Sequence, residues 1–179
     1  MVIGLSVVMA TGCMVLPSDS GDSQVESNMS MRQAQHTIYD YFNQTLIELP
    51  SDIRLSRKPA SDQLGAFTKR KPNALPCWDG SIQSHGPRRV DIAYWIVGIP
   101  PGGTGEYFQR ISDIWIAKGW EQTDRDSSYV SVRTDDGFGL ALEDASKGDG
   151  SLSLTGFSPC VPEETKDSLE DLPEVFPHP

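Results

Sequence analysis

Three cysteines carry the most reactive side chains of this chain. Thiolates bind metals and form disulfides, and some cysteines accept lipids, so their surroundings and spacing narrow the chemistry. Cys13 lies near the start of the chain, whereas Cys77 and Cys160 lie far from it and from each other. No two cysteines have the C-x-x-C spacing, and the last two are too few to build a zinc site alone. We therefore expect lipid or disulfide chemistry, and no metal or cofactor.

The residues around Cys13 are typical of a secretory signal. An apolar run from Val2 to Val8 is followed by Ala10-Thr11-Gly12-Cys13 and then by a polar segment. This order matches a bacterial lipoprotein cleavage site, although Ala10 replaces the usual leucine and no Lys or Arg precedes the run. The run is too short for a transmembrane helix, which needs about 20 apolar residues. We expect residues 1–12 to be a signal peptide and Cys13 to be lipidated on the extracytoplasmic face of the cell membrane; the alternative is an ordinary N-terminus with a chance cysteine.

An outer location determines the expected state of the other two cysteines. An even pair in an oxidising compartment is normally joined, so we expect a disulfide between Cys77 and Cys160. The 179 residues, less a signal peptide and a linker, suffice for one hydrophobic core of ordinary size. The chain is therefore expected to form a single disulfide-bonded domain.

Hydrophobic periodicity predicts an α+β domain over residues 33–161, between a flexible linker (13–32) and a disordered tail rich in Pro and acidic residues (162–179). Two helices are predicted, at 33–48 and 105–118. Strands are predicted at 89–97, 128–134, 138–144 and 151–157. One strand, a helix and a three-stranded meander make a two-layer domain, with an antiparallel sheet and helices packed on one face.

Basic residues are concentrated in one segment of an acidic chain. The formal net charge is −10, from 25 acidic and 15 basic residues, yet residues 54–89 contain eight basic and two acidic side chains. The net charge argues against a nucleic acid partner, because phosphate binding depends on clustered Lys and Arg. The segment could contact an anionic surface near the anchor, or it could be a solvated loop. The candidate contacts are Lys69, Arg70, Lys71, Arg88 and Arg89.

Two short segments have some features of functional sites. Gly102-Gly103-Thr104-Gly105 follows a predicted strand and precedes a predicted helix, where backbone N–H groups can hold an anion. It lacks the Lys-Ser or Lys-Thr of a phosphate-binding loop, so a β–α turn with Thr104 as the N-cap is favoured. His85 with Asp79 and Ser84 is the one local trio of base, acid and nucleophile. Neighbours in a loop rarely have the geometry that hydrolysis needs, so we expect no catalytic residue.

Aspartates and tryptophans are the remaining candidates. The aspartates gather around the predicted meander turns but match no EF-hand spacing, so turn formation explains them better than calcium binding. These residues are Asp124, Asp126, Asp135, Asp136, Asp144 and Asp149. Trp95, Trp115 and Trp120 could line a groove for a sugar or an apolar ligand. Their positions in predicted strands and helices favour the hydrophobic core instead.

Several short motifs are shared with a group of envelope proteins: Gly119-Trp120, Asp136-Gly137-Phe138, Leu140-x-Leu142, Leu152-x-Leu154 and Ser158-Pro159-Cys160. In these motifs the chain resembles actinobacterial cell-envelope lipoproteins, among them the mycobacterial LppA-like proteins. The resemblance implies a lipidated cysteine, a linker, an α+β domain with a cysteine on each side of its core strands, and a Pro-rich tail. It implies no biochemical activity.

Together these features predict a non-catalytic binding or accessory module of the bacterial cell envelope, held at the membrane through Cys13. Its expected partners are an envelope protein or an anionic polymer. The alternatives are a carrier of a lipid or other small apolar ligand between helices and sheet, and a small envelope hydrolase built on the His85 loop.

Overall fold

The computed structural model describes residues 25–26, 28–77 and 85–179. The predicted signal peptide and Cys13 lie outside the described residues. The elements, in chain order, are α1 (Met31–Leu46), β1 (Arg54–Ser56), β2 (Asn73–Pro76), β3 (Arg88–Val97), α2 (Thr104–Ala117), β4 (Glu121–Arg125), β5 (Tyr129–Arg133), β6 (Gly139–Asp144), β7 (Leu152–Phe157), a 3₁₀ helix η1 (Glu163–Ser168) and β8 (Val175–Phe176).

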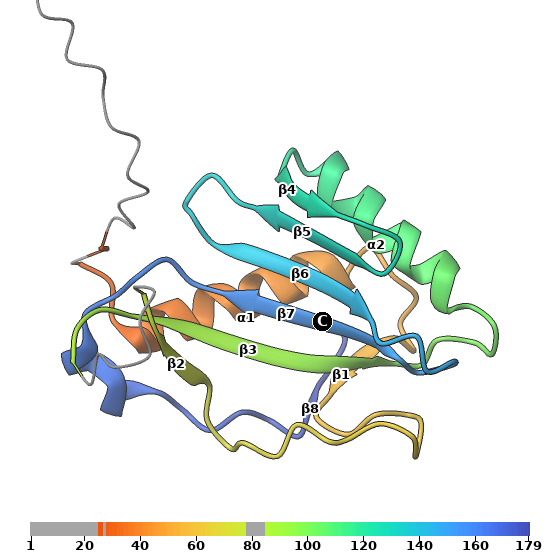
Figure 1. Ribbon diagram of the computed structural model, residues 1–179, viewed down its shortest axis with the longest axis horizontal. Helices are drawn as coiled ribbons and strands as arrows, with labels where there is room; N and C mark the ends of the chain where they lie inside the picture. The colour runs from red at the N-terminus through yellow and green to blue at the C-terminus, as the bar shows by residue number, and fades with distance from the viewer. Residues whose placement is uncertain (1–24, 27, 78–84) are drawn as a thin grey trace, which may run out of the picture.

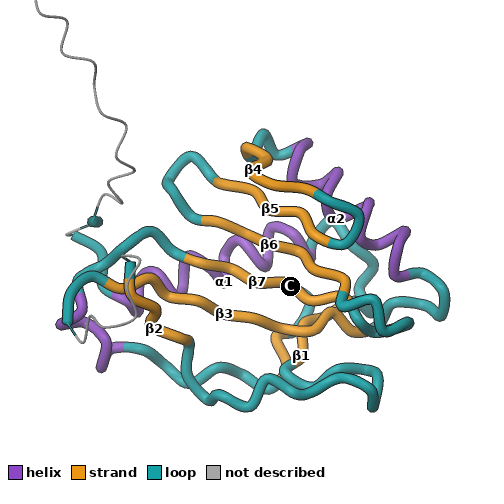
Figure 2. The backbone as a smooth tube through the Cα atoms, in the orientation of Figure 1, coloured by secondary structure: helices purple, strands orange, loops and turns teal. Residues whose placement is uncertain are grey.

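The fold is α+β, with an open antiparallel sheet of eight strands (Figures 1 and 2). The strand order is β4-β5-β6-β7-β3-β1-β8, and β2 also pairs with β3. The long strand β3 therefore has β7 along one side and both β1 and β2 along the other. Figure 1 shows α1 and α2 on the same side of the sheet. We call the opposite side the open face.

The start of α1 is fixed by a capping box. The Ser30 hydroxyl accepts a hydrogen bond from the Gln33 backbone, and the Gln33 side chain accepts one from the Ser30 backbone. These reciprocal bonds satisfy N–H groups that a helix start leaves without partners. The helix consequently begins at Met31, inside the segment expected to be linker, and Met31 itself is fully buried.

Side chains four residues apart on α1 pack onto the sheet. Ile38 and Phe42 are buried, and both lie directly over Gly156 of β7, where any Cβ would touch them. Gly156 thus allows the helix to approach the strand closely. Further along the helix, Thr45 accepts a hydrogen bond from the indole of Trp115 on α2 (3.0 Å), which joins the two helices in the core.

The ends of α2 follow the predicted pattern at one terminus only. Gly119 has φ +81° and follows the last turn, and Trp120 folds back so that its ring lies 6.4 Å from that of Trp115. At the other terminus, Gly103 is the N-cap and Thr104 is the first helical residue. The prediction of Thr104 as N-cap is wrong, because the turn holds its hydroxyl in a buried position without a hydrogen-bond partner.

The sheet has more strands than the predicted ones. β4 consists of polar residues that are all exposed, and it extends the meander at the edge of the sheet. β1, β2 and β8 have at most four residues each, too few to show an alternating pattern. These strands depend on pairing with residues distant in sequence, which is why local periodicity did not predict them.

The tail 162–179 is ordered, so the expectation of disorder is wrong. It forms η1 and then the short strand β8, which pairs with β1. Phe176 is buried with its ring 5.1 Å from Tyr39 and 6.1 Å from Phe42, and Leu169 is buried as well. Two well-placed apolar side chains thus hold a segment whose average composition is acidic and Pro-rich.

Candidate functional site

Several segments distant in sequence meet at one end of the sheet, beyond the end of β7 and the start of β3. The disulfide between Cys77 and Cys160 lies there, with a Cα–Cα distance of 6.0 Å. Cys160 also pairs with Val25, and its carbonyl accepts the Glu26 N–H (2.8 Å). We call this region the disulfide end. It is where the chain enters the domain from its N-terminal side (Figure 1).

The disulfide was predicted from the number of cysteines, and the structure brings the two together. Closing a loop of 83 residues stabilises a domain by about 4 to 5 kcal/mol on the chain-entropy estimate. Backbone bonds reinforce the link, because Arg88 and Val161 exchange two hydrogen bonds beside it (2.9 and 2.8 Å). The disulfide end is therefore held both covalently and by the backbone.

Glu163 is the main electrostatic feature of the disulfide end. Its carboxylate accepts the Gly86 N–H (2.6 Å) and a bond from the Arg88 guanidinium (3.2 Å). The Gly86 bond, followed by the charge of Arg88, lowers the Glu163 pKa below its usual value of 4.5. Sequence reasoning missed this residue, since it assigned Glu163 to a disordered tail. The carboxylate bridges the tail to the start of β3.

Most of the five basic residues predicted to contact an anionic partner interact with other residues of the same chain. Arg70 pairs with Asp171 of the tail (2.7 Å), and Arg88 pairs with Glu163. The Lys69 ammonium donates to the Asn73 side chain. The Arg89 guanidinium lies over the Phe157 ring, 5.4 Å from its centre, and Lys71 is exposed. The five residues do not form one surface of unpaired cations.

Other ion pairs also join the basic segment to the acidic tail. Lys58 pairs with Glu174 (2.5 Å), which lowers the Glu174 pKa. The Arg57 backbone N–H donates to the Glu174 carbonyl (2.9 Å), and the Leu172 N–H donates to the Arg70 carbonyl (2.6 Å). The charge asymmetry of the sequence thus corresponds to two complementary segments that lie against each other.

The proposed hydrolytic trio lies largely outside the described residues, because Asp79 and Ser84 are among residues 78–84. His85 is described, and its side chain is 91% exposed with Nδ1 3.8 Å from the Glu163 carboxylate. The carboxylate that His85 approaches is therefore one from the tail. The Gly102 N–H, in the loop before α2, donates to the Asp149 side chain (2.7 Å), which is part of a loop-to-loop contact.

The remaining candidates do not converge on one place. Asp126 accepts backbone hydrogen bonds from Ser128 and Tyr129 in a turn, and these bonds lower its pKa. Within the described ranges, no group of three or more metal-ligating side chains is close enough to hold a metal ion. Trp115 and Trp120 lie on the helix side of the sheet, whereas Trp95 lies on the open face beneath Phe67, with ring centres 5.1 Å apart.

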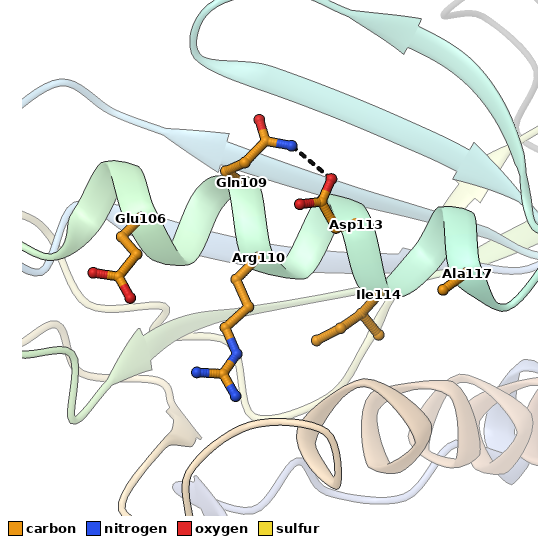
Figure 3. A pocket seen from close by; sticks show the side chains of 6 residues that line it. All are labelled: Glu106, Gln109, Arg110, Asp113, Ile114 and Ala117. Atoms are coloured by element: carbon orange, nitrogen blue, oxygen red, sulfur yellow. Dashed lines mark hydrogen bonds between the residues drawn. The ribbon is translucent and has the colours of Figure 1, made fainter.

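A shallow groove of about 670 Å³ runs along the outward side of α2 (Figure 3). Ile114 and Ala117 form its apolar part, and the Arg110 guanidinium donates to the Glu48 carbonyl (3.2 Å). The groove does not lie between helices and sheet, where the predicted carrier would hold its ligand. Large side chains fill that space, among them Trp115, Tyr94, Phe42 and Phe138, all fully buried.

In the described part of the chain, no helix has the length and hydropathy needed to cross a bilayer. Protein-family models, curated proteins and solved structures were compared with the chain, and none of them matches it.

Proposed function

We propose that this protein is a non-catalytic binding or accessory module of a bacterial cell envelope, anchored by a lipid on Cys13. The disulfide end carries the proposal. A disulfide between Cys77 and Cys160 is expected only where the compartment is oxidising, and the segment that follows Cys13 enters the domain beside that bond. The resemblance to actinobacterial lipoproteins belongs to the same proposal.

The internal pairing of the basic segment favours a protein over an anionic polymer as the partner. Arg70 and Arg88, two of the five candidate contacts, are paired with carboxylates of the tail. An anionic polymer would have to compete with these carboxylates, which are held at a high effective concentration. The membrane itself remains the first partner, through the lipid.

The test is the intact mass of the protein purified from the membrane fraction of an actinobacterial host, with and without a reductant. The expected mass is that of a chain beginning at Cys13 with diacylglycerol and a fatty acid attached, and reduction adds two hydrogens. Cys13→Ser is the matched control, and it should yield a chain without lipid outside the membrane fraction. An unprocessed wild-type chain with free thiols would overturn the proposal.

A further inference from the structure

The domain holds the backbone of the tail, and not only its side chains. Gln35 of α1 is fully buried, and its side-chain amide binds both backbone groups of Glu170: Oε1 accepts the N–H (2.9 Å) and Nε2 donates to the carbonyl (3.2 Å). The Tyr94 hydroxyl donates to the Pro173 carbonyl (3.1 Å). The pairing of β8 with β1 continues this pattern along the edge of the sheet (Figure 1). Proteins that bind an extended peptide as an added strand use backbone bonds of this kind.

The side chains of β8 alternate between the core and the solvent. Phe176 is 8% exposed, whereas its neighbour Val175 is 45% exposed. The Phe176 ring lies among three aromatic rings, with centres 5.1 Å from Tyr39, 6.1 Å from Phe42 and 6.3 Å from Tyr94. One aromatic anchor beside backbone bonds gives a strand-binding surface its sequence preference.

Two carboxylates of the tail lie against cations at the surface. Asp171 pairs with Arg70, whose side chain is 80% exposed, and Glu174 pairs with Lys58, whose side chain is 71% exposed. Ion pairs this exposed contribute little to stability. They favour an acidic segment at this position without locking the tail in place.

The tail follows the part of the chain that is closed by the disulfide. The bond between Cys77 and Cys160 joins the core before the tail begins, and β8 is a two-residue strand at the edge of the sheet. Among the described strand pairs, only the pairing of β8 with β1 involves the tail. The tail can therefore leave without separating any other pair of strands.

The docked tail does not satisfy every polar group beside it. The Arg57 N–H donates to the Glu174 carbonyl, yet the Nε of the same arginine is buried and has no hydrogen-bond partner among the described residues. A buried donor without a partner costs free energy that a better-placed acceptor would recover. A segment that supplies such an acceptor would bind more tightly than the tail does.

We propose that the surface beneath the tail is a peptide-binding site, which an extended acidic segment of a partner protein occupies in exchange for the tail. The segment that fits has two carboxylates three residues apart and an aromatic side chain two residues after the second, as in Asp171, Glu174 and Phe176. The proposal deepens the proposed function and rests on it, because it takes the partner to be a protein. The binding surface includes Gln35, Tyr39, Arg57, Lys58, Arg70 and Tyr94.

The probe is a labelled peptide with the sequence of residues 168–179, titrated by fluorescence anisotropy into the full chain carrying Cys13→Ser. The tail competes with the peptide at a high effective concentration, so the wild-type tail should keep binding weak. Phe176→Ser in the chain weakens this competitor and should lower the Kd of the peptide about tenfold. Val175→Ser, at the exposed neighbouring position, is the matched control and should leave the Kd unchanged. Circular dichroism shows whether each variant is folded.

A second variant releases the tail without removing a buried ring. Asp171→Lys with Glu174→Lys changes only the side chains of the two exposed ion pairs, and it too should lower the Kd of the peptide. A folded chain of either variant that binds the peptide no better than the wild type would overturn the proposal.

A charge exchange shows whether the peptide occupies the same surface as the tail. Lys58→Glu, added to the Phe176→Ser chain, should weaken binding of the natural peptide about threefold, and a peptide with Glu174→Lys should restore it. A peptide affinity that does not respond to either change would overturn the site. A wild-type chain that sediments as a dimer, and as a monomer with Phe176→Ser, would overturn the separate partner in favour of the tail of a second copy.

The Cys13→Ser chain carries no lipid, so the peptide titration is independent of the mass measurement that tests the anchor. Failure of the titration would leave the anchor in place, and failure of the mass measurement would leave the peptide affinity unchanged.

Discussion

Both faces of the sheet contain buried side chains, but for different reasons. On the helix side, Leu154 is 1% exposed because α1 covers it, and its neighbours Leu140 and Leu142 are also large and fully buried. On the open face, Ala141 is 7% exposed and Ser153 is 9% exposed although neither helix lies over them. Low exposure therefore identifies the core only when the covering element is also identified.

The two faces also differ in what holds their side chains in place. The helix side is explained by folding alone, since burying large apolar side chains stabilises the domain. The open face is held by fewer and more local contacts: Phe67 stacks on Trp95, and the Thr123 and Ser131 hydroxyls share a hydrogen bond (2.8 Å).

The largest expected contrast comes from removing one phenylalanine on each face. Phe42→Ala removes a fully buried ring beneath α1 and should lower the free energy of unfolding by about 3 to 5 kcal/mol. Phe157→Ala removes a half-buried ring on the open face and its contact with Arg89, with an expected loss of about 1 kcal/mol. Urea unfolding of the Cys13→Ser chain measures both. Equal losses would show that the open face packs as firmly as the core.

Two glycines on neighbouring strands give a sharper comparison. An added Cβ at Gly156 would lie 2.5 Å from Ile38 and 3.0 Å from the Phe42 ring, so Gly156→Ala should cost about 1 to 3 kcal/mol. At Gly139 the added Cβ would meet the Phe157 ring, which can turn towards solvent, so the loss should be smaller. Gly65→Ala is the matched control, because no atom lies within 4 Å of the added carbon. The reverse order of losses would contradict the difference between the faces.

The smallest expected effect tests the disulfide end, which depends on charge more than on packing. The pKa of Glu163 is lowered in the folded chain, mainly by the Gly86 N–H, so its carboxylate stabilises the fold above the ordinary pKa of 4.5. This contribution is lost as the pH falls through the lowered folded value. Glu163→Gln should therefore reduce the melting temperature at pH 7 and have progressively less effect at acidic pH.

Glu164→Gln, at the exposed neighbouring position, is the control for this pH dependence. A Glu163→Gln chain whose loss of stability is the same from pH 7 down to about pH 3 would show that the carboxylate charge is not the cause.

The sequence alone predicted the elements whose apolar residues recur with a regular period. Ile38, Phe42 and Leu46 are spaced for one helix face, and Leu152 and Leu154 alternate with polar residues as strand positions do. The cysteine count gave the correct pair. In each case the information lies in the identity of the residues or in their local spacing. The capping box at Ser30 and Gln33 is also a local signal, and it would have placed the start of α1 correctly.

The tertiary structure decided the features that depend on contacts between distant residues. β4 is a strand because β5 pairs with it, and the tail is ordered because Phe176 reaches the ring cluster beneath α1. Part of the basic segment has its partners in the tail, about a hundred residues later, as Arg70 and Asp171 show. No local pattern encodes such pairings, since the stabilising free energy arises only when both segments are already placed by the fold.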